Sequence, residues 1–341
     1  MLKKPGKIKG GRKGKRGSGD LVAVTDLVPA RRRDSLLAWF EVYMEVDGKA
    51  GADKTVLAKA DDLRRFAQFF FEATGGDNID QWTRSVSGDF VKYLARTPSP
   101  RTGKPLAPAT INRVLATLRT AARWIHKQRP FLAGWPLQGI EDIDEDDPEW
   151  QGFSAIEVTR LKSAAEQLIH LKKRSSQRPY RNYAILMVLL YTGLRQFELR
   201  GLNLDQWQGK HLVNIRRKGK RVTRKLLVPK PAREALREYL KQERGKEPGL
   251  LIQSRTGQYL SAQDLDAALK QIARQANASL PAEQHIHLAA HKLRHTALKQ
   301  AADKYDVRFA FELSGHTSPH YIWRYTGLTQ AERDEMMERL H

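Results

Sequence analysis

The 341-residue chain contains no cysteine. This absence excludes a disulfide framework, a Cys-ligated zinc or iron–sulfur site and a thiol nucleophile. The chain also lacks any stretch that reaches the roughly 18 uncharged apolar residues of a membrane span, and its N-terminus lacks the apolar segment of a secretory signal. We therefore expect a soluble intracellular protein.

Acidic residues are scarce relative to basic ones. The chain has 38 Asp and Glu against 60 Lys and Arg, which gives a formal net charge of +22. Solubility alone does not need so large an excess, so the charge predicts a polyanionic partner. A hydrophobic share of 40% is enough for a sizeable core, and at roughly 100 to 200 residues per domain we expect two domains.

Residues 1–19 form a basic segment with almost no apolar side chains. They hold eight basic residues, six glycines and no acidic residue, so the segment cannot offset the entropy cost of ordering by itself. We expect a flexible arm. It either contacts nucleic acid or serves as a solubilising tail.

Residues 31–130 predict a helical domain. Apolar residues recur at helical spacing in four runs, at 35–46, 55–73, 90–94 with its flanks, and 110–125. The fourth run places Ile111, Val114, Leu115 and Leu118 on one face. Its basic residues crowd other faces: Arg113, Arg119, Arg123 and Lys127. They suit either a helix laid against DNA or a solvated basic surface.

Residues 131–153 predict a linker. Periodicity fails there, and seven carboxylates lie among residues 141–149, so this stretch cannot lie along DNA phosphates. Ser154 and Glu157 then have the spacing of a capping box, which predicts the first helix of a second domain, residues 154–326.

The second domain is expected to be mostly helical with one small antiparallel sheet. The apolar run 183–191 predicts a buried helix, and residues 211–229 predict a β-hairpin around a Gly-containing turn. The whole chain is therefore expected to be mainly α, with a helical bundle followed by a mostly helical α+β domain.

Three short segments of this domain combine Arg, His or Tyr with turn or helix-start residues. In TGLRQFEL, Arg195 and Glu198 lie three apart and share a helix face; in HKLRHT, so do His291 and Arg294. In LSGHTSPHYIWRYTG, Tyr325 follows the histidine of the GH pair by nine residues. Each segment alone is unspecific.

Together, in this order and with the basic hairpin between the first two, the segments resemble the tyrosine recombinase (phage integrase-type) family. The family pattern runs TGLRxxEL, a hairpin lysine, HxLRHT and GHxxxxxxxxY, and the resemblance covers residues 154–325 and, less closely, the 110–119 helix. It implies a core-binding domain at 31–130, a catalytic domain at 154–326, and a site-specific DNA recombinase of the bacterial cytoplasm or nucleoid. Such an enzyme cuts and rejoins DNA through a 3′-phosphotyrosyl intermediate and a Holliday junction.

The resemblance also implies partners and residue roles. The partners would be double-stranded DNA with inverted-repeat half-sites, a homotetramer on two sites and, in some systems, DNA-bending accessory proteins. No cofactor is implied, because a phosphodiester can be cleaved by a nucleophile, a leaving-group acid and fixed positive charge. The implied catalytic residues are the nucleophile Tyr325, the phosphate-binding Arg195, Arg294 and His316, the acid/base partner His291, the supporting Glu198, which buttresses Arg195 or His291, and the general acid Lys218.

Several alternatives stay open at this point. Lys220 competes with Lys218 as the acid and otherwise joins Lys292 among the expected DNA-binding residues, while Tyr321 and Tyr305 compete with Tyr325. Clustered histidines between 285 and 320 suggest a metal, but no carboxylate accompanies them as in HExxH.

The C-terminal residues 327–341 predict a short helix that packs on its own domain or docks on a neighbouring protomer. At the level of function, the alternatives are a catalytically silent DNA-binding protein and a relative that acts as a type IB topoisomerase or telomere resolvase.

Overall fold

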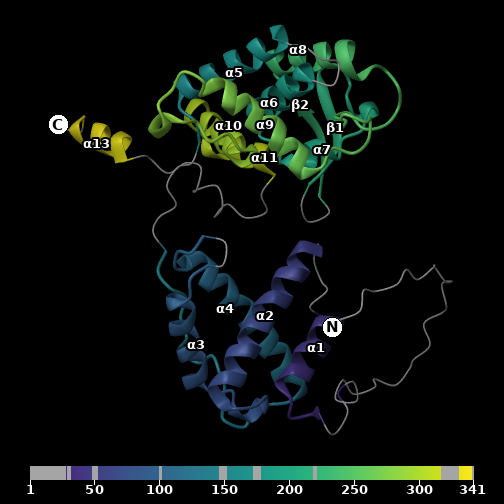
Figure 1. Cartoon of the computed structure of the whole chain (residues 1–341). Coiled ribbons are helices and arrows are strands. Elements are labelled where there is room, and N and C mark those ends of the chain that lie inside the picture. The colour runs from purple at the N-terminus through teal and green to yellow at the C-terminus, as the bar shows by residue number, and fades with distance from the viewer. Residues whose placement is uncertain are drawn as a thin grey trace, which may run out of the picture. The chain divides into compact units, whose positions relative to one another are not determined.

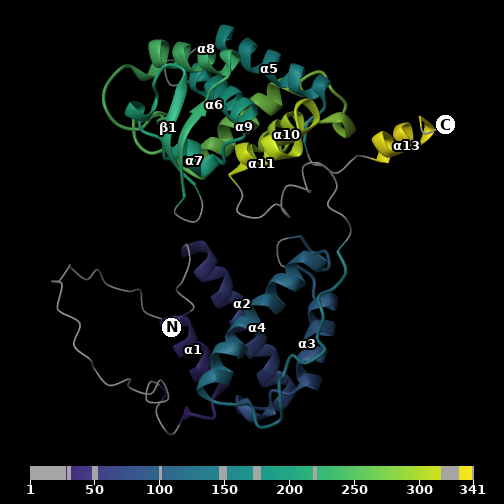
Figure 2. The same ribbon diagram turned by 180° about the vertical axis from the view of Figure 1, so that it is seen from behind.

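The chain divides into two compact units, Met1–Asp146 and Asp147–His341. The structure, a computed structural model, describes residue 28 and residues 32–47, 53–99, 102–145, 152–171, 178–217, 221–315 and 330–339. Figure 1 shows both units, and Figure 2 shows them from behind. The division falls inside the acidic stretch 141–149.

Unit 1 is a helical bundle. Its elements are α1 (Leu36–Val46), α2 (Asp53–Thr74), the short 3₁₀ turn η3 (Ile79–Gln81), α3 (Arg84–Arg96) and α4 (Pro108–Gln128). Helix α4 contacts the other three helices, and the predicted apolar face of α4, including Ile111, Val114 and Leu118, is buried. The side chains of Ser35 and Thr83 cap α1 and α3, which explains where these two helices begin.

Aromatic rings fill the interior of unit 1. Trp39, Phe66, Trp82 and Phe90 are at most 1% exposed, and the Phe66 ring centroid lies 4.9 Å from those of both Trp82 and Phe90. Tilted and edge-to-face pairs of this kind stabilise beyond the area they bury.

Unit 2 is built around helix α6. Its helices are α5 (Ala155–His170), α6 (Pro179–Thr192), α7 (Gln196–Arg200), α8 (Lys230–Tyr239), the π-helical turn η5 (Leu240–Arg244), α9 (Ala262–Ala276), α10 (Ala290–Lys304), α11 (Val307–Ser314) and α13 (Gln330–Glu338), with 3₁₀ turns η4 (Leu204–Gln206) and η6 (Ala282–Gln284). Helix α6 contacts α5, α8, α9 and α10 (Figures 1 and 2). The predicted Ser154–Glu157 capping box is confirmed at the start of α5.

The sheet of unit 2 is a single hairpin. Strand β1 (His211–Arg216) pairs antiparallel with β2 (Val222–Leu227), and Ile215 lies opposite Thr223. Asn214 has a φ of 51°, and this left-handed residue lets Leu212 and Ile215, three positions apart, both enter the core. The predicted fold class, mainly helical with one small antiparallel sheet, is confirmed. Within the described ranges, no helix combines the length and apolar character needed to cross a membrane.

Candidate active site

The predicted motif TGLRQFEL lies where α6 ends and α7 begins. Helix α6 ends at Gly193, which has a φ of 61°, and Arg195 precedes the first residue of α7. A Cβ on Gly193 would lie 3.5 Å from Leu298 and 3.6 Å from Ala297 of α10. These are ordinary van der Waals distances, so glycine is favoured here by the left-handed backbone, and the turn packs directly against α10, the helix that carries HKLRHT.

Arg294 of α10 joins three segments that are distant in the sequence. Arg294 is 5% exposed. Its guanidinium donates to the carbonyl of Gly193 and, at 2.6 Å, to the carbonyl of Ser314. Ser314 ends α11, one residue before Gly315. A planar guanidinium with five N–H donors can hold two such carbonyls at once, so Arg294 brings the end of α6 to the end of α11.

Glu198 of α7 holds two arginines with one carboxylate. Its Oε2 accepts hydrogen bonds from the backbone N–H of Arg195 and from the guanidinium of Arg217, both at 2.8 Å. Its Oε1 accepts from the Arg195 guanidinium at 3.2 Å. The side chain of Glu198 is 0% exposed. Of the two supporting roles expected for Glu198, these contacts match the one toward Arg195.

Arg217 is a site neighbour that the sequence analysis did not single out. Strand alternation in the sequence could have predicted that Arg217 is buried. Arg217 follows the buried Ile215 by two positions, and side chains two apart on a strand point to the same side. The run of basic residues around Arg217 instead suggested an exposed turn.

His291 and His295 lie one helical turn apart on α10, with ring centroids 6.0 Å apart. Partial desolvation, together with the Lys292 ammonium, lowers the pKa of His291 from its ordinary value of 6.5. Burial, with smaller contributions from His291 and Arg294, lowers the pKa of His295 to about 4. Both imidazoles are therefore neutral at pH 7, and a neutral imidazole can accept a proton.

Four residues of the predicted site, Lys218, Lys220, His316 and Tyr325, and the rival nucleophile Tyr321 lie outside the described residues. The other rival, Tyr305, is 66% exposed, and its ring packs against that of Phe309 at 5.1 Å. The Lys292 ammonium lies 5.8 Å from the centre of the Phe153 ring.

The four basic residues predicted to contact DNA from α4 differ in their surroundings. Arg113 donates at 2.5 Å to Asp62, whose side chain is only 5% exposed, and Arg119 donates at 2.5 Å to Asp142. Arg123 and Lys127 are exposed, with no ion-pair partner among the described residues. A cavity of about 410 Å³ between α2 and α4 is lined by Lys54, Lys59 and Arg113 together with threonine side chains.

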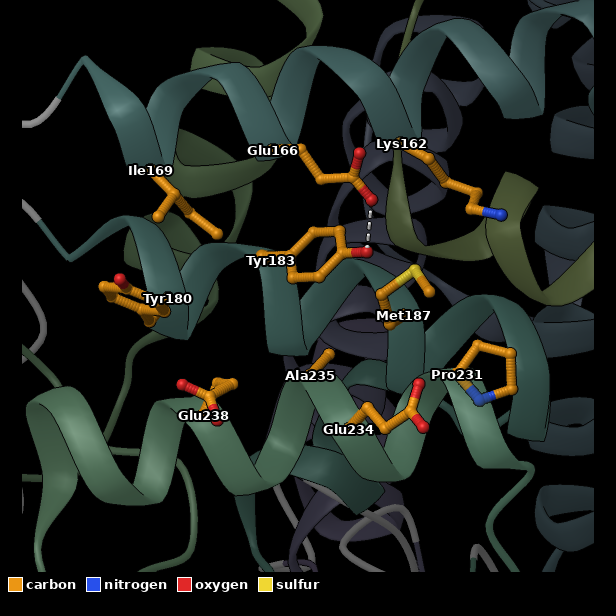
Figure 3. A pocket seen from close by; sticks show the side chains of 10 residues that line it. All are labelled: Lys162, Glu166, Ile169, Tyr180, Tyr183, Met187, Pro231, Glu234, Ala235 and Glu238. Atoms are coloured by element: carbon orange, nitrogen blue, oxygen red, sulfur yellow. Dashed lines mark hydrogen bonds between the residues drawn. The ribbon is translucent and has the colours of Figure 1, made fainter.

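A second cavity, of about 330 Å³, lies among α5, α6 and α8 (Figure 3). Glu166, Glu234 and Glu238 line it, and the Tyr183 hydroxyl donates to Glu166 at 2.7 Å. Burial and this hydrogen bond raise the pKa of Tyr183, so the phenol stays protonated. Three carboxylates would repel a phosphate, and the cavity is therefore a poor surface for DNA.

Over the part of the chain that the structure describes, no group of three or more His, Asp or Glu side chains is placed to hold a metal ion.

Comparison with known proteins identifies the family. The sequence profile of the Phage integrase family matches residues 159–332, about half of the chain. The chain belongs to the phage integrase family. Its activity is that of a site-specific DNA recombinase of the tyrosine type, as the sequence predicts.

Individual relatives agree with this assignment. A tyrosine recombinase XerC of Neisseria meningitidis serogroup B is 27% identical over 301 residues, which cover 86% of this chain and 92% of the relative. The XerC of Alcanivorax borkumensis is 30% identical over 231 residues, covering 64% of this chain and 69% of the relative.

Solved structures establish the recombinase fold. The Tn1549 transposon integrase in complex with a circular intermediate DNA has a TM-score of 0.66 at 17% identity, covering 90% of this chain and 99% of that one. A lambda integrase dimer bound to a COC′ core site has a TM-score of 0.64 at 17% identity, with 86% and 95% coverage.

Proposed function

We propose that Tyr325 is the nucleophile of this recombinase and that the residues around Arg195 and Arg294 act on the scissile phosphate. The Tyr325 oxygen attacks phosphorus, a new P–O bond to tyrosine forms, and the bond to the 5′-oxygen breaks. The products are a 3′-phosphotyrosyl link and a free 5′-hydroxyl. The link conserves the energy of the phosphodiester, so rejoining requires no nucleotide.

Fixed positive charge stabilises the transition state in this mechanism. Arg195 and Arg294 supply planar forks that match the oxygens of a phosphate, a geometry that lysine does not reproduce. His316 donates a further hydrogen bond to the phosphate. Glu198 orients Arg195, and its charge is balanced by Arg195 and Arg217 on either side, which limits its repulsion of the phosphate.

Two proton transfers complete the step. His291 accepts the proton of the Tyr325 hydroxyl, a role that needs the neutral imidazole, and the lowered pKa of His291 favours that form at pH 7. Lys218 gives a proton to the leaving 5′-oxygen. The observation that carries the proposal is the Arg294 guanidinium, which joins Gly193 of the TGLR segment to Ser314, two residues before His316.

Covalent trapping tests the proposal. A suicide duplex with a nick near the cleavage position loses its 5′-hydroxyl fragment on cutting, so the adduct accumulates. We expect an SDS-resistant adduct in EDTA and without nucleotide, with the phosphate on Tyr325 by peptide mass spectrometry. DNA binding without any adduct would instead indicate a silent DNA-binding protein. Relaxation of supercoiled DNA without strand exchange would favour a topoisomerase.

The assignment of Lys218 needs a separate experiment. Lys218→Ala should cleave an ordinary phosphodiester roughly 100-fold or more slowly than the wild-type protein does. It should nevertheless cleave a 5′-bridging phosphorothiolate at much of the wild-type rate. The sulfur leaving group needs no proton. If Lys220→Ala shows this pattern while Lys218→Ala cleaves normally, Lys220 is the acid.

Unit 1 supplies much of the DNA-binding surface in this proposal. The α2–α4 cavity combines three cations with threonine hydroxyls, groups that bind phosphate oxygens. Arg119, Arg123 and Lys127 extend this surface along α4, while Lys220 and Lys292 contact DNA from unit 2. The DNA carries inverted-repeat half-sites, and four protomers act on two sites, with bending proteins where the system requires them.

The C-terminal helix α13 links the protomers. Its Met336 and Met337 are 54% and 62% exposed, which supports docking on a neighbouring protomer. A chain that ends at Gly327 should bind one half-site normally but fill the second without cooperativity in gel-shift titrations. Unchanged cooperativity would assign α13 to its own protomer.

A further inference from the structure

Arg217 is a buried cation to which the proposed chemistry gives no role of its own. The side chains of Arg217 and its partner Glu198 are 2% and 0% exposed. Removing two charges from water costs free energy that their attraction often does no more than offset, so such a pair is a weak source of stability. The contacts of Arg217 point instead to a geometric role.

The first set of contacts fixes the end of the hairpin. The backbone N–H of Arg217 donates to the carbonyl of Arg221 at 2.7 Å, and its Nε donates to Thr223 Oγ1 on the facing strand at 2.9 Å. Lys218 is the next residue in the chain. The position of Arg217 therefore sets the point from which Lys218 extends.

A second contact connects the hairpin to the phosphate-binding arginine. The Glu198 carboxylate that accepts from Arg217 at 2.8 Å also accepts from the backbone and side chain of Arg195. The residue after β1 and the residue before α7 are thus held by the same carboxylate. Without Arg217, Glu198 keeps both of its hydrogen bonds to Arg195, so a displacement of Arg217 should act mainly on Lys218.

A third contact reaches the residue before His316. A Cβ built on Gly315 would lie 3.3 Å from Arg217 Nε and 3.5 Å from its Cζ, and Gly315 has a φ of 61°. The guanidinium therefore lies against a backbone position that glycine keeps open. Arg294 donates to the adjacent Ser314 carbonyl, so two cations meet the C-terminal end of α11, where positive charge is favourable.

We propose that Arg217 is a positioning residue that sets the hairpin lysine relative to Arg195 and His316. The inference rests on the proposed function, because it assumes that Lys218 protonates the leaving oxygen. Arginine suits the role since one planar group donates to Glu198 and Thr223 in fixed directions.

The test compares two cleavage substrates, an ordinary suicide duplex and its 5′-bridging phosphorothiolate counterpart. Arg217→Met should shift the hairpin lysine by about 1 Å. The variant should therefore cleave the ordinary duplex roughly 100-fold more slowly than wild type. Because sulfur leaves without a proton, the phosphorothiolate should restore its rate to within about threefold of wild type. Thr223→Val, which removes only the hydroxyl that Arg217 contacts, should show the same pattern with a smaller loss.

The controls separate positioning from folding and from charge. Arg237→Met removes an exposed arginine of α8 and should cleave both duplexes at the wild-type rate. DNA affinity and melting temperature are measured for every variant. If Arg217→Met does not fold, Thr223→Val decides, and its wild-type cleavage of both duplexes would overturn the inference.

Failure of the inference differs from failure of the proposed function. Equal losses on both duplexes by a folded, DNA-binding Arg217→Met, while the phosphorothiolate rescues Lys218→Ala, would overturn the positioning role alone. Absence of rescue in Lys218→Ala would remove the general-acid assignment, and the inference with it.

Discussion

The two units of the chain bury different kinds of side chain. In unit 1 the largest buried groups are rings, including Trp39, Trp82 and Phe66. The interior of unit 2 is aliphatic and surrounds α6. Unit 2 also buries a set of charged residues: Arg181, Glu198, Arg217, Arg244, Arg294 and Lys299.

This difference reflects two tasks. Rings that pack edge to face give unit 1 a stable platform, whose α4 arginines pair with the exposed Asp142 and the buried Asp62 or face solvent. Unit 2 accepts the desolvation of buried charge where charge must be fixed in place. Arg244 shows that not every buried cation is catalytic, since it binds the carbonyls of Glu247 and Leu250 in its own loop. We therefore expect substitutions in the core of unit 1 to change stability and those beside Glu198 to change chemistry.

The largest expected effect is on chemistry in unit 2. Tyr325→Phe should bind target DNA with unchanged affinity and form no covalent adduct, because it lacks the oxygen that attacks phosphorus. Gel shift and denaturing electrophoresis on the nicked duplex measure the two properties. Tyr321→Phe is the matched control and should form the adduct. An adduct on the Tyr325→Phe protein would place the nucleophile elsewhere.

The second prediction concerns stability in unit 1. Trp82 is 0% exposed, and its ring lies within 5.9 Å of the rings of Phe40, Phe66 and Phe131. Trp82→Ala should lower the free energy of unfolding of unit 1 by about 3 to 5 kcal/mol. Calorimetry on the full chain should then show an early transition for unit 1 beside an unshifted one for unit 2.

Phe71 provides the control for this comparison. It lies on α2 like Phe66 but is 56% exposed, so Phe71→Ala should change stability by no more than about 0.5 kcal/mol. A single transition that moves as a whole in Trp82→Ala would show that the units unfold together. The two units would then differ in the kinds of side chain that they bury but not in their stability.

Local signals in the sequence predicted most of the fold. Ser154 and Glu157 marked the start of α5 because a capping box is a contact between residues three apart. The apolar face of α4 followed from helical spacing, since Ile111, Val114 and Leu118 share one side. These features depend only on neighbours in the chain.

Contacts between distant segments were not predictable in this way. Arg217 and Glu198 are 19 positions apart and Arg113 and Asp62 are 51 apart, so no periodicity links them. The motif order indicated which residues belong to the site only through the family resemblance. That resemblance included Glu198 but gave no role to the arginine on its other side.

The third prediction concerns the pH dependence of the free energy of unfolding of unit 2, which contains His295. The folded state keeps His295 neutral down to about pH 4, while the unfolded chain protonates it near 6.5. Between these values the unfolded state binds more protons, so the free energy of unfolding falls as pH falls. Because solvent screens the partly exposed imidazole, the loss for unit 2 should be at most about 2 kcal/mol from pH 7.5 to pH 5.

His295→Gln tests the source of this pH dependence. The variant should lose most of the difference between pH 7.5 and pH 5 in denaturant unfolding, because glutamine does not titrate. The lowered pKa of His291 contributes in the same direction, so a smaller slope should persist. A wild-type slope in the variant would assign the pH dependence to other groups.

The smallest expected effect lies on the surface of unit 1 and compares two arginines of α4. Arg123 is exposed, whereas the Arg119 side chain is 21% exposed and donates to Asp142 and to the Ile140 carbonyl. Each lost phosphate contact should reduce the slope of log K against log salt by about 0.9. Arg123→Ala should show this reduction in fluorescence anisotropy titrations. Arg119→Ala should show a smaller reduction, because Asp142 already balances the charge of Arg119.

Arg119→Ala should also destabilise unit 1, because Asp142 and the Ile140 carbonyl lose their hydrogen bonds to Arg119. A larger slope change for Arg119→Ala would mean that DNA displaces Asp142, and paired surface arginines would then count as DNA contacts.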